Sequence, residues 1–460
     1  MTTKTKSASD PVTLIYQACD PTEALEPGDR RYVPLAAARG DEFAEQGGWR
    51  RQITRAIYRS NAPASCLVSG FLGDGKSTEL KRLAQELRDG TTGPKFATIY
   101  VDCEKYINPD AYSFADILVA IIGETGKQLK VEYGINLNPS YLRTRIDEIY
   151  NLLTSNVAME SADVKAKLEP LEIALKLSLK TKVEATTRRE LWAALEGENS
   201  DLAERFGELL RAEVRPALRE RGYHDIVVVV DYLEKLICLK TTTEGTPNSH
   251  VDLFIHHAPH FLKLGTHLVL TVPIDLVYSA DQERLTSAYG REPQAISAVR
   301  VISHFADNDR RIALDAMVEL IRRRCERLGD GSVAFDAVFP DKLLAEELVE
   351  FPGGHPRQLL ILIRQCLQFI EELPITREAF VAAKKKEVEA ASRKVPERWF
   401  AKLAAVHATH RIDNDAEHLE MLRTLCIFAY SNSEPVYSVD PAILELTRMK
   451  EAIGAHAKTS

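Results

Sequence analysis

The residues best suited to do chemistry lie in the stretch from Ser65 to Leu80, S-C-L-V-S-G-F-L-G-D-G-K-S-T-E-L. Gly70, Gly75, Lys76 and Ser77 fit the phosphate-binding pattern G-x-x-x-x-G-K-[ST], between a short apolar strand and the start of a helix. Glycines let the backbone curl so that successive N–H groups point at phosphate oxygens, and the helix start offers its positive dipole end. The pattern predicts a nucleotide site in which Lys76 reaches the β- and γ-phosphates and the Ser77 hydroxyl ligates Mg²⁺.

Gly73, Asp74 and Thr78 complete the predicted nucleotide-binding loop. The alternative is a chance glycine-rich turn between a strand and a helix. Because the required strand precedes the loop and the required helix follows it, the nucleotide interpretation is favoured.

A second stretch, D-I-V-V-V-V-D-Y-L-E from Asp225 to Glu234, runs five β-branched apolar residues into Asp231. A strand that is apolar on both faces is typical of a buried parallel sheet. An acid at the carboxyl end of such a strand holds Mg²⁺ in nucleotide-binding proteins. Without the glycine-rich loop elsewhere in the chain, the same acid would more readily be interpreted as the cap of the following helix. Together with the loop, Asp231 is predicted to be a magnesium ligand.

Two further residues are candidates by position. Thr271 lies near the end of a predicted strand from His267 to Ile274, where a hydroxyl could sense the γ-phosphate through water. Arg357 follows P-G-G-H-P, in which Pro356 suits the first turn of a helix. Arg357 could therefore face a bound nucleotide, or it could be a solvated helix residue.

The composition limits the class of protein. The 460 residues are enough for two to four domains, and 45% apolar with 27% charged residues is ordinary for a globular protein. A net charge of −8 gives no sign of a general nucleic-acid or membrane surface. The seven cysteines are scattered singly, which argues against a disulfide framework or a zinc site. The absence of a long apolar run or apolar leader predicts a cytoplasmic protein without a membrane span.

Strands alternating with helices predict an α/β fold with a three-layer parallel-sheet core. We expect a tail and linker over residues 1–44, a P-loop NTPase core over 45–307 with a mostly helical insertion at 104–224, a helical lid over 308–394 and a winged-helix-like domain over 395–460. Arg300–Phe305 is expected to be a fifth strand. Strict alternation over Leu171–Val183 predicts a further strand, either in a small hairpin or at an edge that pairs with another chain.

The winged-helix-like region consists of two predicted helices, a hairpin with strands at 427–430 and 436–439, and a helix opened by Asp440-Pro441. From Pro396 to Ser460 it has seven Lys or Arg against nine Asp or Glu, and no Lys or Arg in the hairpin. A DNA-reading domain needs cations for phosphate contacts. The charge therefore favours a protein-facing or autoinhibitory role.

The loop G-F-L-G-D-G-K-S, the strands V-V-V-V-D-Y-L-E and L-V-L-T-V-P, and G-G-H-P-R together resemble the AAA+/STAND branch of P-loop ATPases over residues 45–370. This group contains origin-recognition-type ATPases and bacterial STAND-like signalling proteins. The resemblance implies ATP rather than GTP, since no guanine-reading N-K-x-D is present. It assigns the cofactor roles to Lys76, Ser77 and Asp231, water activation to Glu234, and sensor one and sensor two to Thr271 and Arg357.

Tyr232 stands where many AAA+ proteins have a glutamate, and the acid comes three positions after Asp231, as in D-x-x-[DE] STAND proteins. The resemblance therefore implies slow ATP hydrolysis. No single arginine finger can be named among Arg284, Arg291 and Arg300.

We expect a Mg²⁺-dependent ATP switch that controls a protein partner or effector, as in STAND-like stress signalling or antiviral phage defence. The protein could form a homo-oligomer, and DNA is disfavoured as a partner. One alternative is a DNA-associated, origin-recognition-like AAA+ ATPase. Another is a scaffold that binds nucleotide without hydrolysing it.

Overall fold

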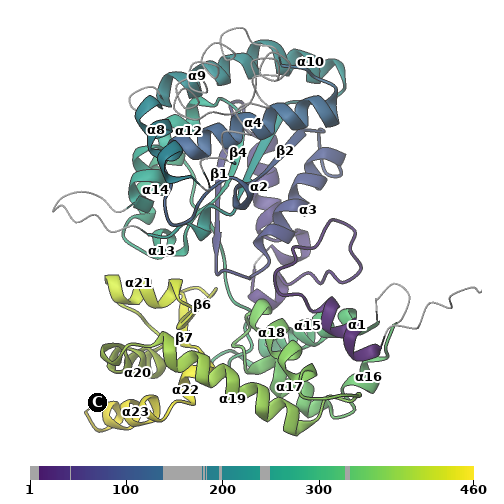
Figure 1. Cartoon of the computed structure of the whole chain (residues 1–460), viewed down its shortest axis with the longest axis vertical. Helices are drawn as coiled ribbons and strands as arrows, with labels where there is room; N and C mark the ends of the chain where they lie inside the picture. The colour runs from purple at the N-terminus through teal and green to yellow at the C-terminus, as the bar shows by residue number, and fades with distance from the viewer. Residues whose placement is uncertain are drawn as a thin grey trace, which may run out of the picture. The chain divides into compact units, whose positions relative to one another are not determined.

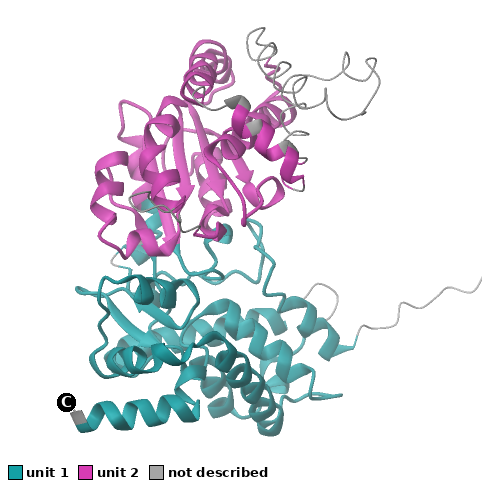
Figure 2. Cartoon of the chain, turned by 60° about the vertical axis from the view of Figure 1, so that its left-hand side comes forward, with its two compact units in different colours: residues 1–51, 70–78, 296–460 teal, residues 52–69, 79–295 magenta. Residues whose placement is uncertain are grey.

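The structure, a computed structural model, describes residues 10–41, 43–137, 179, 182, 184–195, 199–238, 249–326 and 332–459 (Figure 1). Its contacts divide the chain into two compact units, which Figure 2 colours separately. Residues 52–69 and 79–295 form one unit, here called the sheet unit. Residues 1–51, 70–78 and 296–460 form the other, here called the helical unit.

The sheet unit is built on a five-stranded sheet in the order β2-β3-β4-β1-β5. The strands are β1 (Ser65–Gly70), β2 (Ala97–Asp102), β3 (Ile226–Asp231), β4 (His267–Thr271) and β5 (Gln294–Ile296). The pairs β1–β4, β3–β4 and β2–β3 are parallel. Their carboxyl ends therefore meet at one edge of the sheet, as expected for the predicted parallel core.

Helices surround this sheet, so every residue of β3 is buried, which explains its unbroken apolar sequence. The long helix α4 (Phe114–Tyr133) is buried along most of its length and shares one hydrophobic core with the strands. The other α-helices that lie wholly or mostly in this unit are α2 (Trp49–Tyr58), α3 (Lys76–Asp89), α8 (Ala185–Leu195), α9 (Asn199–Leu209), α10 (Arg215–Glu220), α11 (Ser249–Val251), α12 (Ala258–Lys263), α13 (Ile274–Val277) and α14 (Gln282–Tyr289). The first three residues of α2 and of α3 belong to the helical unit. Short 3₁₀ or π turns are η3 (Cys103–Lys105), η4 (Leu210–Val214), η5 (Leu233–Lys235) and η6 (Asp252–His256).

The helical unit contains a second core, formed mainly by helices that follow the sheet region in sequence. Its α-helices are α1 (Pro11–Ala18), α15 (Asp307–Glu326), α16 (Phe335–Val338), α17 (Lys342–Glu350), α18 (Pro356–Leu367), α19 (Arg377–Lys394), α20 (Phe400–Thr409), α21 (Ala416–Arg423), α22 (Pro441–Leu444) and α23 (Thr447–Thr459). Short 3₁₀ helices are η1 (Ala37–Arg39), η2 (Ala44–Gln46) and η7 (Glu397–Trp399). Strands β6 (Ile427–Tyr430) and β7 (Val436–Val439) form an antiparallel hairpin, so the expected helix–helix–hairpin order is present.

Two expectations about local structure were wrong. Residues 300–305 do not form a strand, and β5 lies earlier, at Gln294–Ile296. The reason is that Val299 N–H donates to the Gly354 carbonyl at 3.1 Å and Arg300 N–H to the Ala38 carbonyl at 3.0 Å, so this backbone bonds outside the sheet. The segment expected to be a linker contains α1, whose Ile15 is fully buried in the core of the helical unit.

The insertion between β2 and β3 is helical where it is described, in α4 and α8 to α10. The helix expected over 141–154 lies outside the described residues. So does most of the strand expected over 171–183, of which Leu179 and Lys182 are described and are helical. Among the described helices, none has the length and apolar character needed to cross a membrane.

Candidate nucleotide-binding site

The predicted phosphate loop leaves β1 and enters α3, which begins at Lys76. Gly73 and Gly75 have φ angles of 102° and 85°, which residues with a Cβ rarely adopt. At Gly73 an added Cβ would also lie 2.5 Å from the Cβ of Arg357. Glycine is therefore required at position 73 both by the backbone angle and by the close approach of α18.

Lys76 is buried, with 3% of its surface exposed. Its Nζ donates to the carbonyl of Gly70 at 2.9 Å and to that of Phe71 at 2.7 Å. Both acceptors belong to the loop, so the ammonium is held against the loop backbone. A phosphate that binds to the loop would meet a positive charge already in place, which is the arrangement that phosphoryl chemistry uses.

Two arginines approach the same loop within the helical unit. Arg357, the second residue of α18, covers Gly73 and donates from Nε to the Pro21 carbonyl at 3.0 Å. Buried Arg39 donates from Nη2 to the Asp74 carbonyl at 2.7 Å. The sequence predicted Arg357 but missed Arg39, because nothing in its local sequence distinguishes it from other arginines.

Asp74 is a buried acid at the centre of this group, with 2% exposure. Its Oδ2 accepts from Phe71 N–H at 3.0 Å, and burial raises the pKa of its carboxyl to about 6. Fully buried His355 places Nε2 3.8 Å from Asp74 Oδ1, and burial lowers the pKa of this imidazole to about 3. At neutral pH the histidine is therefore uncharged, so the charge of Asp74 is balanced by the cations rather than by His355.

The two hydroxyl residues at the start of α3 have different surroundings. Ser77 is half-buried in the first turn of the helix. The Oγ1 of Thr78 accepts from the backbone N–H of Leu25 at 3.0 Å. Thr78 therefore links the N-terminal segment to the start of α3. This structural contact was not expected, because the sequence predicted only a nucleotide-binding role for Thr78.

In the sheet unit, Asp231 is fully buried at the carboxyl end of β3. Its Oδ1 accepts from Tyr232 N–H at 2.8 Å, and its Oδ2 accepts from the hydroxyl of Tyr100 on β2. Burial first, and then the charge of Asp231, raises the pKa of Tyr100, so this phenol stays protonated and acts as the donor. Tyr100 was missed because strand residues on β2 cannot be matched to β3 without the sheet register.

The segment after Asp231 turns sharply. Tyr232 has a φ of 72°, a left-handed conformation that is costly for a residue with a side chain, and Glu234 lies in the short turn η5, half-buried. Leu233 N–H donates to Thr271 Oγ1 at 2.9 Å. Thr271 is fully buried, so in this structure its hydroxyl fixes the turn that carries Glu234.

The ends of β1 and β4 are joined by a side-chain contact. Ser69 Oγ donates to the Val272 carbonyl at 2.9 Å. Ser69 is the residue before Gly70, where the loop begins, and Val272 is the residue after Thr271. The structure thus groups Asp231, Glu234 and Thr271 at the sheet edge from which the phosphate loop departs, and it groups the loop residues with Arg357 in the helical unit. The chain has a P-loop ATPase fold.

No protein-family model matches the sequence, and no curated protein matches it significantly. Among solved structures, the chain is similar to a Walker-type ATPase of Pyrococcus abyssi, at 16% identity and a TM-score of 0.35, over 90% of this chain and 97% of that one. It is similar to Cdc6p from Pyrobaculum aerophilum, at 13% identity and a TM-score of 0.38, over 96% and 98%. It is also similar to the ORC2 protein of Aeropyrum pernix in ADPNP–ADP complexes, at 10% identity and a TM-score of 0.40, over 96% and 98%.

Proposed function

We propose that the protein is a Mg²⁺-dependent ATP switch of the AAA+/STAND type, which hydrolyses ATP slowly and controls a protein partner or effector. The observation that carries the proposal is the buried Lys76 ammonium on a glycine loop that Arg357 covers and Arg39 contacts. Three cations around one loop suit a polyphosphate, because charge-assisted bonds to phosphate oxygens are stronger than neutral ones.

The residues fit the chemistry that such a nucleotide needs. The Ser77 hydroxyl and the Asp231 carboxylate are hard oxygen donors of the kind that Mg²⁺ prefers, and when bound the ion would neutralise charge on the phosphates. Tyr100 holds the Asp231 carboxylate in one orientation. Glu234, one turn further along, would orient the attacking water, and Thr271 fixes the turn that positions it.

A switch requires that the occupant of the loop affects another part of the protein. Within the helical unit, the ring of Phe71 in the loop packs edge-on against Phe428 of β6, with centroids 5.6 Å apart. The His355 ring stacks on the same phenylalanine at 5.7 Å, and Tyr430 of β6 donates to the Gly353 carbonyl at 2.7 Å. Because Phe428 is fully buried, a shift of Phe71 on phosphate binding would have to move the hairpin as well.

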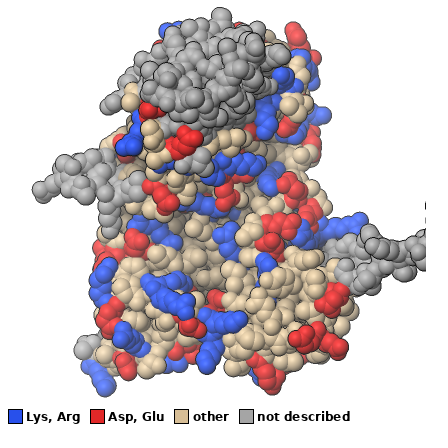
Figure 3. Space-filling view, in the orientation of Figure 1, with Lys and Arg blue, Asp and Glu red and all other residues tan. Residues whose placement is uncertain are grey.

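Charge pairing favours a protein over DNA as the partner of the C-terminal region. Lys402 of α20 contacts Asp415 at 2.7 Å and Glu417 at 2.8 Å, and Arg398 contacts Glu417 at 2.9 Å. On the face drawn in Figure 3, basic and acidic side chains are interspersed. Phosphates would have to displace these carboxylates, which weakens the counterion-release gain of DNA binding.

The DNA-associated ATPase is the second candidate function. The order of α20, α21 and the β6–β7 hairpin favours it, because that is the order of elements in a winged helix.

A cytoplasmic setting is supported by the seven free cysteines, six of them buried.

The test measures Mg-ATP binding by calorimetry for the wild type, Lys76→Ala and the control Lys450→Ala, whose side chain is 59% exposed. Loss of a bond from a charged group predicts affinity lower by about 10- to 150-fold for Lys76→Ala, and no change for the control. Unchanged binding by Lys76→Ala would refute the nucleotide site.

Turnover is then followed with and without duplex DNA, and the molecular mass is measured with and without ATP. Nanomolar duplex binding with DNA-stimulated hydrolysis would favour the second candidate. Tight Mg-ATP binding without hydrolysis would favour the scaffold, and a nucleotide-dependent change in mass would support self-association.

A further inference from the structure

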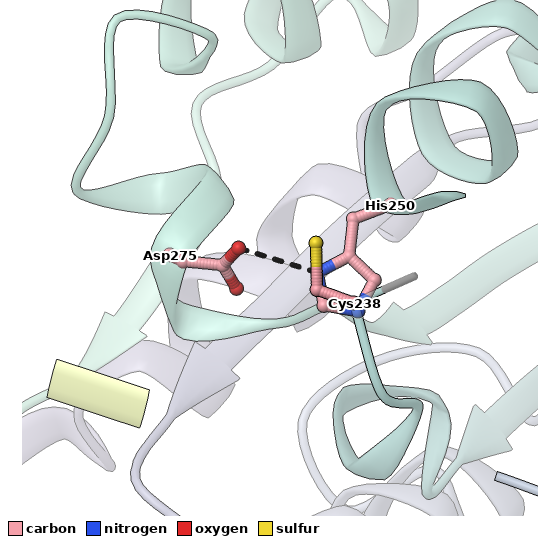
Figure 4. A group of neighbouring side chains, drawn as sticks. All are labelled: Cys238, His250 and Asp275. Carbon is pink, nitrogen blue, oxygen red and sulfur yellow. Dashed lines mark hydrogen bonds and ion pairs between the residues drawn. The ribbon is translucent and has the colours of Figure 1, made fainter. Parts of the chain in front are cut away.

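Three side chains of different chemistry converge in the sheet unit, outside the predicted nucleotide residues (Figure 4). They are Cys238, seven positions after Asp231, His250 in α11, and Asp275 in α13. Their ligand atoms, a thiol sulfur, a ring nitrogen and a carboxylate oxygen, all lie within 4.8 Å of one another. His250 and Asp275 are 1% and 6% exposed, whereas Cys238 is half-buried.

The hydrogen bonds of His250 decide which ring nitrogen is available. Nε2 lies 2.8 Å from the Leu236 carbonyl, and since a carbonyl only accepts, Nε2 must carry the hydrogen. In the neutral ring Nδ1 then presents a lone pair, and it faces Asp275 Oδ2 at 3.3 Å. A histidine that donates one N–H to a backbone carbonyl while the other nitrogen faces further ligands is the usual arrangement at a metal site.

Two acceptors that face each other need a cation between them, either a proton or a metal ion. A charge-assisted N–H···O bond to a carboxylate is typically ~2.7–2.9 Å long, which is shorter than the 3.3 Å observed. Tetrahedral zinc with bonds to nitrogen and oxygen near 2.1 Å places these two atoms about 3.4 Å apart. The observed separation matches the edge of such a tetrahedron.

The arrangement does not match a nucleophilic Cys–His–Asp relay. A relay needs one ring nitrogen for the thiol and the other for the acid. Here the Leu236 carbonyl occupies Nε2 and the Asp275 carboxylate faces Nδ1, so no separate ring nitrogen remains for the thiol.

The segments that carry the thiol and the imidazole are held in place by Tyr112. Its hydroxyl donates to the Ile237 carbonyl at 2.9 Å and lies 2.7 Å from Ser249 Oγ, next to Cys238 and His250 respectively. Ile237 N–H also donates to the Pro109 carbonyl at 3.0 Å. The ligand positions are therefore fixed by neighbouring residues.

We propose that Cys238, His250 and Asp275 bind a zinc ion, with solvent in the fourth position. A thiolate and an imidazole select a borderline ion such as Zn²⁺ over Mg²⁺, so this site is chemically distinct from the Ser77 and Asp231 pair. The ion would join the segment that follows β3, which carries Glu234, to the segment that follows β4, whose last residue is Thr271. No sequence pattern indicated this site, since the cysteines are scattered singly and argued against zinc. The three proposed ligands come from segments that only the fold brings together.

The test titrates Zn²⁺ into the full-length, chelator-treated protein against a chromophoric competitor, and repeats the titration with Co²⁺. We expect one equivalent to bind, with a thiolate-to-cobalt charge-transfer band and the visible bands of tetrahedral Co²⁺. Cys238→Ser should lose the charge-transfer band and bind Zn²⁺ more weakly by over ~100-fold, beyond the loss typical of an outer-shell change. The control His418→Gln removes the histidine of a second potential ligand group among the described residues, Asp413, Asp415 and His418, and should bind as wild type.

A second measurement needs no variant. Cys238 is the one cysteine that is not buried, so it should be alkylated first in the native protein, and one equivalent of Zn²⁺ should protect it, as read by peptide mass spectrometry. The proposal is overturned if no stoichiometric zinc binds, if Cys238→Ser retains the cobalt charge-transfer band, or if zinc leaves the alkylation rate of Cys238 unchanged.

Discussion

Replacing Asp74 with asparagine is expected to stabilise the nucleotide-free protein at neutral pH. Asp74 is 2% exposed, and burial raises the pKa of its carboxyl to about 6 despite the opposing charges of Arg39 and Lys76. An asparagine oxygen can still accept the bond from Phe71 N–H, but it carries no charge that must be desolvated.

The sign and size of the expected change in the free energy of unfolding follow from the difference between the folded and unfolded pKa values of Asp74. The folded state binds the proton more tightly than the unfolded chain, in which the pKa is 3.8. The stabilisation from Asp74 is therefore complete below pH 3.8 and is lost as the pH rises to about 6. A shift of about 2 pKa units corresponds to roughly 3 kcal/mol. The free energy of unfolding of Asp74→Asn minus that of wild type should thus increase by roughly 3 kcal/mol between about pH 4 and pH 7.

The assay is urea unfolding followed by tryptophan fluorescence in a Trp192→Phe background, since the remaining Trp49 and Trp399 both lie in the helical unit. The buried His355 is common to both proteins, so its titration largely cancels in the difference. Asp336→Asn, at an exposed position of the same unit, controls for the removal of one carboxylate. A difference that is flat across this range, or that falls with pH, would refute the buried-charge reasoning.

Four further outcomes are expected. Glu234→Gln keeps its shape but loses the base, so Mg-ATP should stay bound while turnover, measured by phosphate release, falls ~10²–10⁴-fold; unchanged turnover would make Glu234 structural. Gly73→Ala should lower ATP affinity and melting temperature, because its Cβ would meet Arg357 at 2.5 Å. Gly454→Ala in α23, where an added Cβ meets nothing within 4 Å, should instead stabilise by about 0.5–1 kcal/mol. Duplex DNA should bind weakly, with an affinity that falls steeply with salt; a sequence-specific nanomolar complex at physiological salt would contradict this.

Local structure near the site was predictable wherever the physical cause was local. The unbroken apolar run of β3 ended at Asp231 as expected, and Pro356 began α18 because proline is tolerated at the first helical position. The strand expected at residues 300–305 failed for a non-local reason, since the backbone of Arg300 is bonded to Ala38. Helix α1 was missed because Pro, Asp and Gly around it indicated a linker, whereas its order comes from packing of Ile15 in the second core.

The sequence by itself determined the glycine-rich loop, because glycines at 73 and 75 permit φ angles that other residues avoid, and it determined the central strand β3, because a strand buried on both faces must be apolar. Only the tertiary structure decided which distant groups meet. Tyr100 reaches Asp231 through the register of β2 on β3, Arg39 reaches Asp74 through the packing of the N-terminal segment, and Cys238 meets His250 and Asp275 where three segments converge. Backbone preferences act between neighbours in the chain, whereas these contacts depend on how whole elements bury their apolar faces, which no short pattern encodes.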